Sequence, residues 1–172
     1  MRNRFLLLFS IELSLMILGS GCSDIVPVWS GETVLKEQTL RYTEDPVEFV
    51  VDIDVADSIV SLRLELQITY YQGIGREDLP LFLILEDAQH NIIEHTTDIQ
   101  LKSENEWLGV QEKNEIDYTL LHNAIPDISL RPGKYSLKIY ANDQKNEQIF
   151  GIVKIVARFY RYEDGPSDTE DF

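Results

Sequence analysis

The sequence is poor in the residues from which many functional sites are built. It contains one cysteine, Cys22, so no disulfide can form within the chain, and only three histidines. His90 and His95 are an odd number of residues apart and would face opposite ways on one strand, so no metal site is predicted. Because G-x-S-x-G, P-loop and strand–helix G-x-G-x-x-G motifs are also missing, we expect no catalytic residue and no cofactor.

Basic residues are scarce as well. The chain has 15 Lys and Arg against 30 Asp and Glu, a formal net charge of −15. No stripe of basic side chains is available to meet phosphates, so binding to nucleic acid is not expected. A surface of this charge favours solubility.

Long apolar runs are missing except at the N-terminus. This segment contains, in order, Arg2 and Arg4, a mainly apolar run over residues 5–18, the small residues Gly19-Ser20-Gly21, and then Cys22. A positive start, a short apolar run and small residues at the cleavage site are typical of a secretory signal peptide. A spanning helix needs about 20 apolar residues, so this run is too short for an ordinary transmembrane anchor. We predict residues 1–21 as a signal peptide.

The segment Leu18-Gly19-Ser20-Gly21-Cys22 resembles a lipobox, the motif that directs lipid attachment in bacterial lipoproteins. The resemblance implies that the Cys22 sulfur carries a diacylglycerol and that fatty acids such as palmitate hold the mature protein at a membrane. Two or three acyl chains hold a protein firmly, whereas one chain binds only marginally. The alternative is a plain signal peptide followed by a free cysteine.

Alternation of apolar and polar residues dominates the rest of the chain. Residues 47–55 place apolar side chains at every second position, and residues 61–70 alternate strictly. Further short strands are predicted near 81–85, 92–101, 116–121, 134–139 and 149–160, with residues 112–125 ambiguous between helix and strand. Turn residues separate these segments, and no strong helix pattern follows the signal peptide. The sequence therefore predicts an all-β fold, a single antiparallel β-sandwich of about seven to eight strands.

The expected boundaries follow from these patterns. Residues 22–40 are predicted to be a lipidated tether and residues 41–161 the β-sandwich domain. Residues 162–172 are acidic and nearly free of apolar side chains, and we predict that they form a disordered tail.

Aromatic side chains are the main candidates for an interaction site, although most aromatic residues of a β-sandwich belong to its core. Tyr71 and Tyr140 lie opposite the apolar face of their strands or at a strand end, and Trp107 lies in a predicted loop. We predict Tyr71, Trp107 and Tyr140 as candidate interaction residues. Asp52 and Asp54 share a strand face, and a solvated face is favoured over a carboxylate pair for acid–base chemistry or calcium binding.

Several short motifs are shared with a known family. They are the segment 79–87 (LPLFLILED), Trp107-Leu108-Gly109, the segment 131–139 (RPGKYSLKI) and Phe150-Gly151-Ile152. In these motifs the chain resembles the GldH-like gliding-motility lipoprotein family of Bacteroidota over about residues 47–160. The resemblance implies an envelope protein without enzymatic activity that supports the gliding machinery and its linked secretion system.

Two functional hypotheses follow from the sequence, and a third is kept as an alternative to both. The first is a non-enzymatic lipoprotein of the cell envelope, anchored through Cys22, most simply in the outer membrane, that binds other envelope proteins. The second is a surface lipoprotein that binds carbohydrate through exposed aromatic residues. The third is an envelope enzyme that uses a carboxylate pair.

Overall fold

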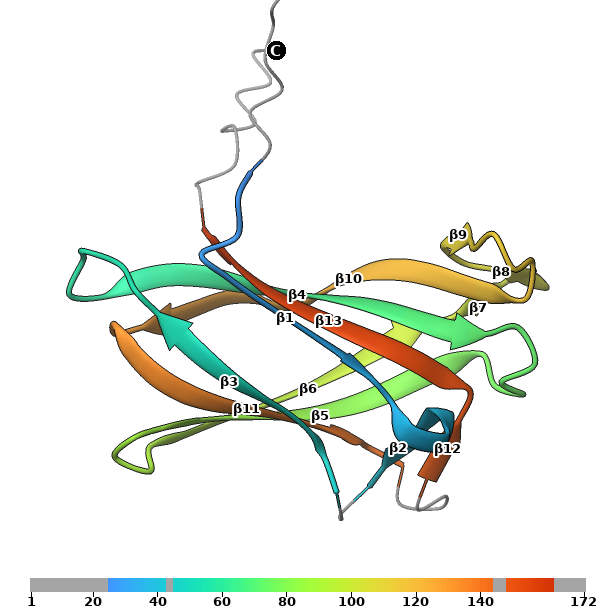
Figure 1. Ribbon diagram of the computed structural model, residues 1–172, viewed down its shortest axis with the longest axis horizontal. Helices are drawn as coiled ribbons and strands as arrows, with labels where there is room; N and C mark the ends of the chain where they lie inside the picture. The colour runs from blue at the N-terminus through green and yellow to red at the C-terminus, as the bar shows by residue number, and fades with distance from the viewer. Residues whose placement is uncertain (1–24, 43–44, 144–147, 163–172) are drawn as a thin grey trace, which may run out of the picture.

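The computed structural model describes residues 25–42, 45–143 and 148–162, so the predicted signal peptide, Cys22 and nearly all of the predicted tail lie outside the described residues. The described part consists almost entirely of antiparallel strands, which confirms the predicted all-β sandwich (Figure 1). The elements are β1 (Trp29–Val34), the 3-10 turn η2 (Lys36–Gln38), β2 (Thr39–Arg41), β3 (Val47–Ile53), β4 (Val60–Tyr71), β5 (Asp78–Asp87), β6 (Ile92–Gln100), β7 (Lys102–Ser103), β8 (Glu106–Trp107), β9 (Val110–Gln111), β10 (Asp117–Leu130), β11 (Gly133–Ala141), β12 (Gln148–Phe150) and β13 (Ile152–Arg161).

Two sheets form the layers of the sandwich. One has the order β1-β13-β4-β10-β9 and the other the order β3-β11-β5-β6, while β12 pairs with β2 and β7 with β8 in short ribbons. The connection from β3 to β4 crosses between the two sheets, whereas β5 and β6 are adjacent in the chain and form a hairpin.

The core lies between the sheets and follows from the period-two pattern. In β4 the inward side chains from Val60 to Tyr70 are buried, and those of β5 from Leu79 to Leu85 are buried in the facing sheet. Phe159 of β13, a strand that lies between β1 and β4, is also fully buried. One continuous apolar cluster therefore joins both layers.

The sandwich begins earlier in the chain than the sequence indicates. Residues 29–34 were predicted as tether, but they form β1, which pairs with β13 from Trp29↔Phe159 to Val34↔Lys154. The ring of Trp29 lies 5.9 Å from that of Phe49 on β3, so β1 closes one side of the sandwich, and Leu40 of β2 is buried. The predicted boundary at residue 41 is therefore wrong. Only Trp29 and a few aliphatic residues carry the burial of this otherwise polar stretch, so no clear alternation marks the strand in the sequence.

Two other segments differ in detail from the prediction. The ambiguous segment 112–125 contributes to β10, a strand of 14 residues that pairs with β4. The last predicted strand is divided by Gly151, whose φ of 96° is readily adopted only by glycine, so that β12 pairs with β2 and β13 with β1 and β4. No helix within the described ranges is long and apolar enough to cross a membrane.

Candidate functional site

The three aromatic residues singled out in the sequence lie in different parts of the sandwich. Tyr71, at the end of β4, is 42% exposed and its ring covers Gly73. Trp107, in β8, is half-buried against Tyr70, with ring centroids 6.0 Å apart, and the ammonium of Lys102 lies 5.3 Å from its ring centroid. These two residues therefore do not form a common surface with Tyr140, which belongs to the other sheet.

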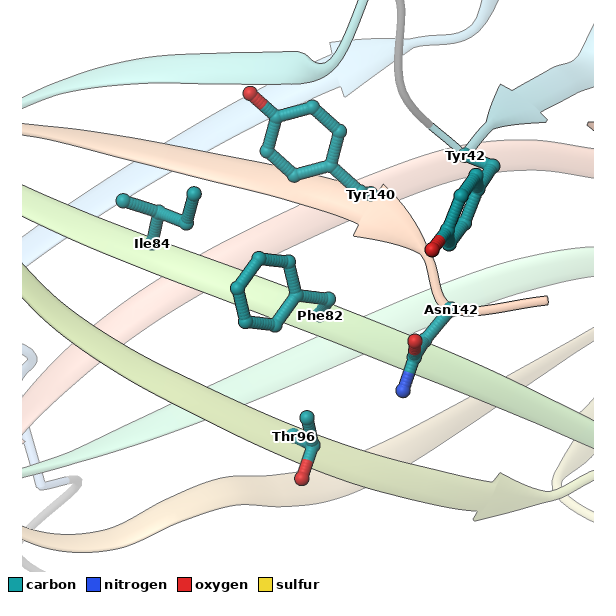
Figure 2. A pocket seen from close by; sticks show the side chains of 6 residues that line it. All are labelled: Tyr42, Phe82, Ile84, Thr96, Tyr140 and Asn142. Carbon is teal, nitrogen blue, oxygen red and sulfur yellow. The ribbon is translucent and has the colours of Figure 1, made fainter. Parts of the chain in front are cut away.

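Tyr140 lines a hollow on the outer face of the sheet β3-β11-β5-β6 (Figure 2). On β11 it stands directly opposite Phe82 of β5, which in turn stands opposite Thr96 of β6. The rings of Tyr140 and Phe82 lie 6.3 Å apart at 37°. The hollow has a volume of about 420 Å³ and is lined by Tyr42, Phe82, Ile84, Thr96, Tyr140 and Asn142, which we call the aromatic groove.

The aromatic groove is unusual for its position. The outer face of an antiparallel sheet is normally solvated and polar, yet Phe82 and Ile84 present apolar side chains there. Thr96 and Asn142 add hydroxyl and amide groups at the rim, as Figure 2 shows. An open apolar surface with a few polar groups at its border is the usual chemistry of a binding site.

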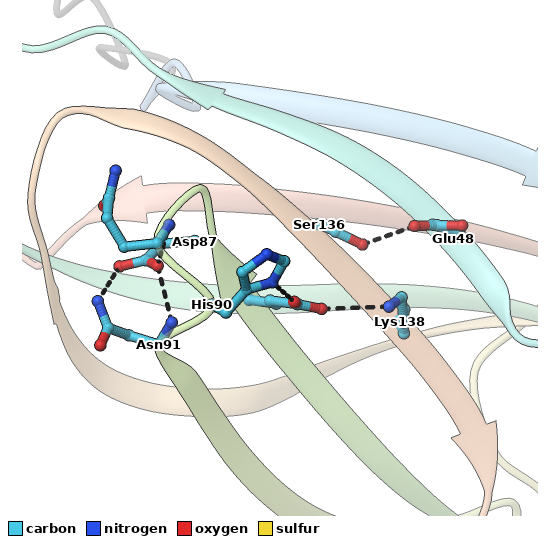
Figure 3. A network of polar contacts seen from close by, with 8 residues as sticks. Glu48, Asp87, His90, Asn91, Ser136 and Lys138 are labelled. Carbon is cyan, nitrogen blue, oxygen red and sulfur yellow. Dashed lines mark hydrogen bonds and ion pairs between the residues drawn. The ribbon is translucent and has the colours of Figure 1, made fainter.

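A polar network continues along the same face from the aromatic groove (Figure 3). The Glu86 carboxylate lies 2.6 Å from Nδ1 of His90 and 3.3 Å from Nζ of Lys138. The hydrogen bond from His90, followed by that from Lys138, holds the pKa of Glu86 below its usual range. On the next strands, the Ser136 hydroxyl donates to Glu48 at 2.7 Å. These contacts hold the polar side chains in place on the part of the sheet face that adjoins the aromatic groove.

The remaining sequence candidates do not form a site. Asp52 and Asp54 are exposed at the end of β3, and neither lines the aromatic groove. Among the described residues, no group of three or more His, Cys, Asp and Glu side chains is arranged to hold a metal ion. The lipidation site predicted at Cys22 lies outside the described residues.

Sequence reasoning missed most of the aromatic groove. The signal was present in residues 81–85, which are apolar at every position, so that both faces of β5 carry apolar side chains. The contributions of Tyr42 and Asn142 were not visible, because the sequence does not reveal which loops meet at the end of a sheet.

Two polar side chains, the buried Tyr70 and the partly buried His122, lie between the sheets, away from this face. The hydroxyl of Tyr70 is within hydrogen-bond distance of the carbonyl oxygens of Leu108 (2.6 Å) and Leu101 (3.0 Å). Burial, with a smaller effect of Tyr118, raises the pKa of Tyr70 to about 12. His122 of β10 lies 2.7 Å from the Thr97 hydroxyl of β6, and burial lowers its pKa. Tyr70 thus joins β4 to the segment around β7 and β8, and His122 joins β10 to β6, so both contacts stabilise the fold.

Comparison with known proteins adds little to these observations. No protein-family model matches the chain, and no curated protein matches it. Among solved structures, the chain is similar to the VP2 subviral particle of infectious bursal disease virus (14% identity, TM-score 0.31, 80% of this chain and 33% of that one) and to the Gx strain of that virus (11% identity, TM-score 0.30, 81% and 34%). The chain thus spans about a third of the length of these viral chains, and a likeness at this level carries no argument about what the protein does.

Proposed function

We propose that the protein is a non-enzymatic, lipid-anchored component of the cell envelope that works by binding. The observation that carries this proposal is the aromatic groove, an apolar hollow of about 420 Å³ on a sheet face that would otherwise be polar. The partner in this proposal is another envelope protein, and the GldH-like sequence motifs suggest gliding or secretion machinery as its setting. Aromatic residues that are partly exposed are enriched at protein interfaces.

Site-specific crosslinking tests whether the aromatic groove is the contact surface. A photoreactive phenylalanine analogue at position 140 should form a defined crosslinked species in cells. The same analogue at position 71 is the matched control, because Tyr71 is an exposed tyrosine outside the groove. Equal crosslinking at both positions, or none at position 140, would count against the groove as the contact surface.

The anchor requires a separate test, since it depends on the sequence alone. Cys22→Ala should move the protein from the membrane fraction to the soluble fraction, and Ser23→Ala should leave it in the membrane fraction. The intact mass of the membrane-bound protein should correspond to a chain that starts at Cys22 with added acyl groups. Retention of Cys22→Ala at the wild-type level in the membrane would refute the anchor.

Carbohydrate binding is a second candidate, favoured by the neighbouring rings of Phe82 and Tyr140 with the polar groups of Thr96 and Asn142 at the rim. Sugar rings stack on aromatic faces while their hydroxyls bond to such groups. A glycan array carrying envelope polysaccharides and β-glucans should then show binding that Tyr140→Ala abolishes and Tyr71→Ala preserves. Absence of any glycan signal with a folded protein would leave protein binding as the proposal.

A further inference from the structure

β6 lies at the edge of its sheet and is bordered by a strand on one side only. In the order β3-β11-β5-β6 it is the last strand, and it pairs only with β5, from Glu86↔Ile92 to Asp78↔Gln100 without a bulge. Natural edge strands are usually short, bulged, or protected by proline or by charged side chains, lysine above all. The nine residues of β6 contain neither lysine nor proline. This edge is therefore long and regular, and the charges of Glu94 and Asp98 are the protection that it carries against strand pairing.

The phase of the hairpin determines which backbone groups face outward. The Asp87 N–H donates to the Asn91 carbonyl at 3.0 Å, and the Leu101 N–H donates to the Glu77 carbonyl at 2.8 Å. Because bonded and non-bonded pairs alternate in an antiparallel ladder, the odd-numbered residues of β6 bond to β5. The N–H and C=O groups of Glu94, Thr96 and Asp98 therefore point away from β5.

A further observation agrees with this assignment. Pro80, which has no N–H to donate, is the β5 residue opposite Asp98 and so stands at a pair that needs no bond between the two strands. Glu94, Thr96 and Asp98 are also exposed, so a partner could reach this part of the edge. Within the described ranges, no backbone hydrogen bond outside the ladders involves β6.

A hollow of about 480 Å³ lies next to this edge, between β6 and β10, which the contact of Thr97 with His122 at 2.7 Å also joins. Its lining is mixed: Ile99, Leu108, Val110, Leu120 and Leu121 are apolar, whereas Asp98, Gln100, Thr119 and His122 place polar groups at it. Leu121 is 62% exposed. A strand added beside β6 would direct every second side chain toward this hollow. Those side chains would be apolar to fill it.

The outer face of the same edge is acidic. Glu94 and Asp98 flank Thr96 on that face, and neither forms an ion pair with a described residue. In the fully overlapped antiparallel pairing of two copies, Glu94 of one copy would stand opposite Asp98 of the other, which is destabilising. Lysine or arginine in the added strand would instead complement both carboxylates.

We propose that the β6 edge binds an extended polypeptide segment of another protein, in which basic and apolar residues alternate. The backbone of that segment pairs with Glu94, Thr96 and Asp98, its basic side chains lie along the outer face, and its apolar side chains enter the hollow between β6 and β10. This edge is distinct from the aromatic groove, although the Thr96 side chain borders both. The inference is independent of the lipid anchor.

The test uses the full-length protein with the synthetic peptide Lys-Val-Lys-Val-Thr-Val-Lys-Val-Lys. Amide exchange followed by NMR should show Glu94, Thr96 and Asp98 exchanging fast in the free protein and slowing by about tenfold or more with peptide. A peptide of the same composition with its lysines and valines in separate blocks controls for attraction to the net negative charge. Equal binding of both peptides, or protection of amides outside β6 in place of those of β6, would overturn the proposal.

Variants separate backbone pairing from charge. The double substitution Glu94→Lys with Asp98→Lys should raise the dissociation constant of the alternating peptide by about tenfold or more. Asp52→Lys, on the opposite edge strand β3, should change that constant by less than about threefold. Thr96→Pro removes one outward N–H and should abolish the exchange protection, while Thr96→Val retains it. If the three amides of the free protein already exchange slowly and light scattering shows a dimer, the edge is a contact between copies and the proposal is wrong.

Discussion

The hydroxyl of Tyr70 connects β4 to the irregular segment that contains β7, β8 and β9, and its removal tests the account of the core. In Tyr70→Phe the ring stays packed near Trp107 and Tyr118, whose centroids lie 6.0 and 6.1 Å away. The Leu101 carbonyl still accepts from the Leu108 N–H at 2.9 Å, but the Leu108 carbonyl loses the donor that lies 2.6 Å away. Because one buried acceptor is left unpaired, the free energy of unfolding should fall by about 1–2 kcal/mol.

Urea unfolding at neutral pH measures this change, and an unchanged m-value would show that both states keep their compactness. Tyr118→Phe is the matched control, because its hydroxyl has no hydrogen-bond partner among the described residues. Since burial raises the pKa of Tyr70 to about 12, the folded protein retains a proton that the unfolded chain releases, so wild-type stability should decline above pH 10 more steeply than that of Tyr70→Phe. A loss of less than about 0.5 kcal/mol at neutral pH would refute the assigned role of the hydroxyl.

Three further predictions concern other parts of the sandwich. Burial lowers the pKa of His122, so the unfolded chain takes up a proton more readily than the folded protein does. The free energy of unfolding should therefore decrease as pH falls below about 6.5. Urea unfolding at pH 7.5 and pH 5 should show that His122→Gln loses this dependence. Gly109→Ala should lower the unfolding free energy by about 1–3 kcal/mol, because φ is 94° and the added methyl would overlap the Thr119 carbonyl oxygen; normal thermal stability would contradict this. Carbon-detected NMR should find Glu86 titrating below an ordinary glutamate, with His90→Gln and Lys138→Met each moving its pKa upward.

Strands with strict alternation could be predicted from the sequence, because one face of each packs on the core. In β4 the inward positions from Leu62 to Tyr70 are all apolar, and the structure buries each of them. The fold class followed from such segments. The strand β1 could not be predicted in the same way, since its edge position requires only the side-chain contact of Trp29 and the ladder to β13.

The candidate site was predictable only in part. Tyr140 is predicted because of its position relative to the apolar face of its strand, but Tyr71 meets the same criterion and lies elsewhere, as does Trp107, which is predicted from its loop position. What distinguishes Tyr140 is its cross-strand neighbour Phe82, and this pairing depends on the register between β11 and β5. Register across strands that are far apart in the chain is set by tertiary packing, which local patterns do not report.

The pairing of β1 with β13 brings the two ends of the described chain to the same end of the sandwich. Trp29 lies beside Phe159, so the described chain enters and leaves at one end, whereas β2 lies toward the opposite end (Figure 1). Six residues separate Cys22 from Trp29 in the sequence, a span of at most about 25 Å. If Cys22 carries the proposed lipid, the domain stands close to its leaflet with the aromatic groove turned outward, within reach of a partner that approaches from the aqueous side.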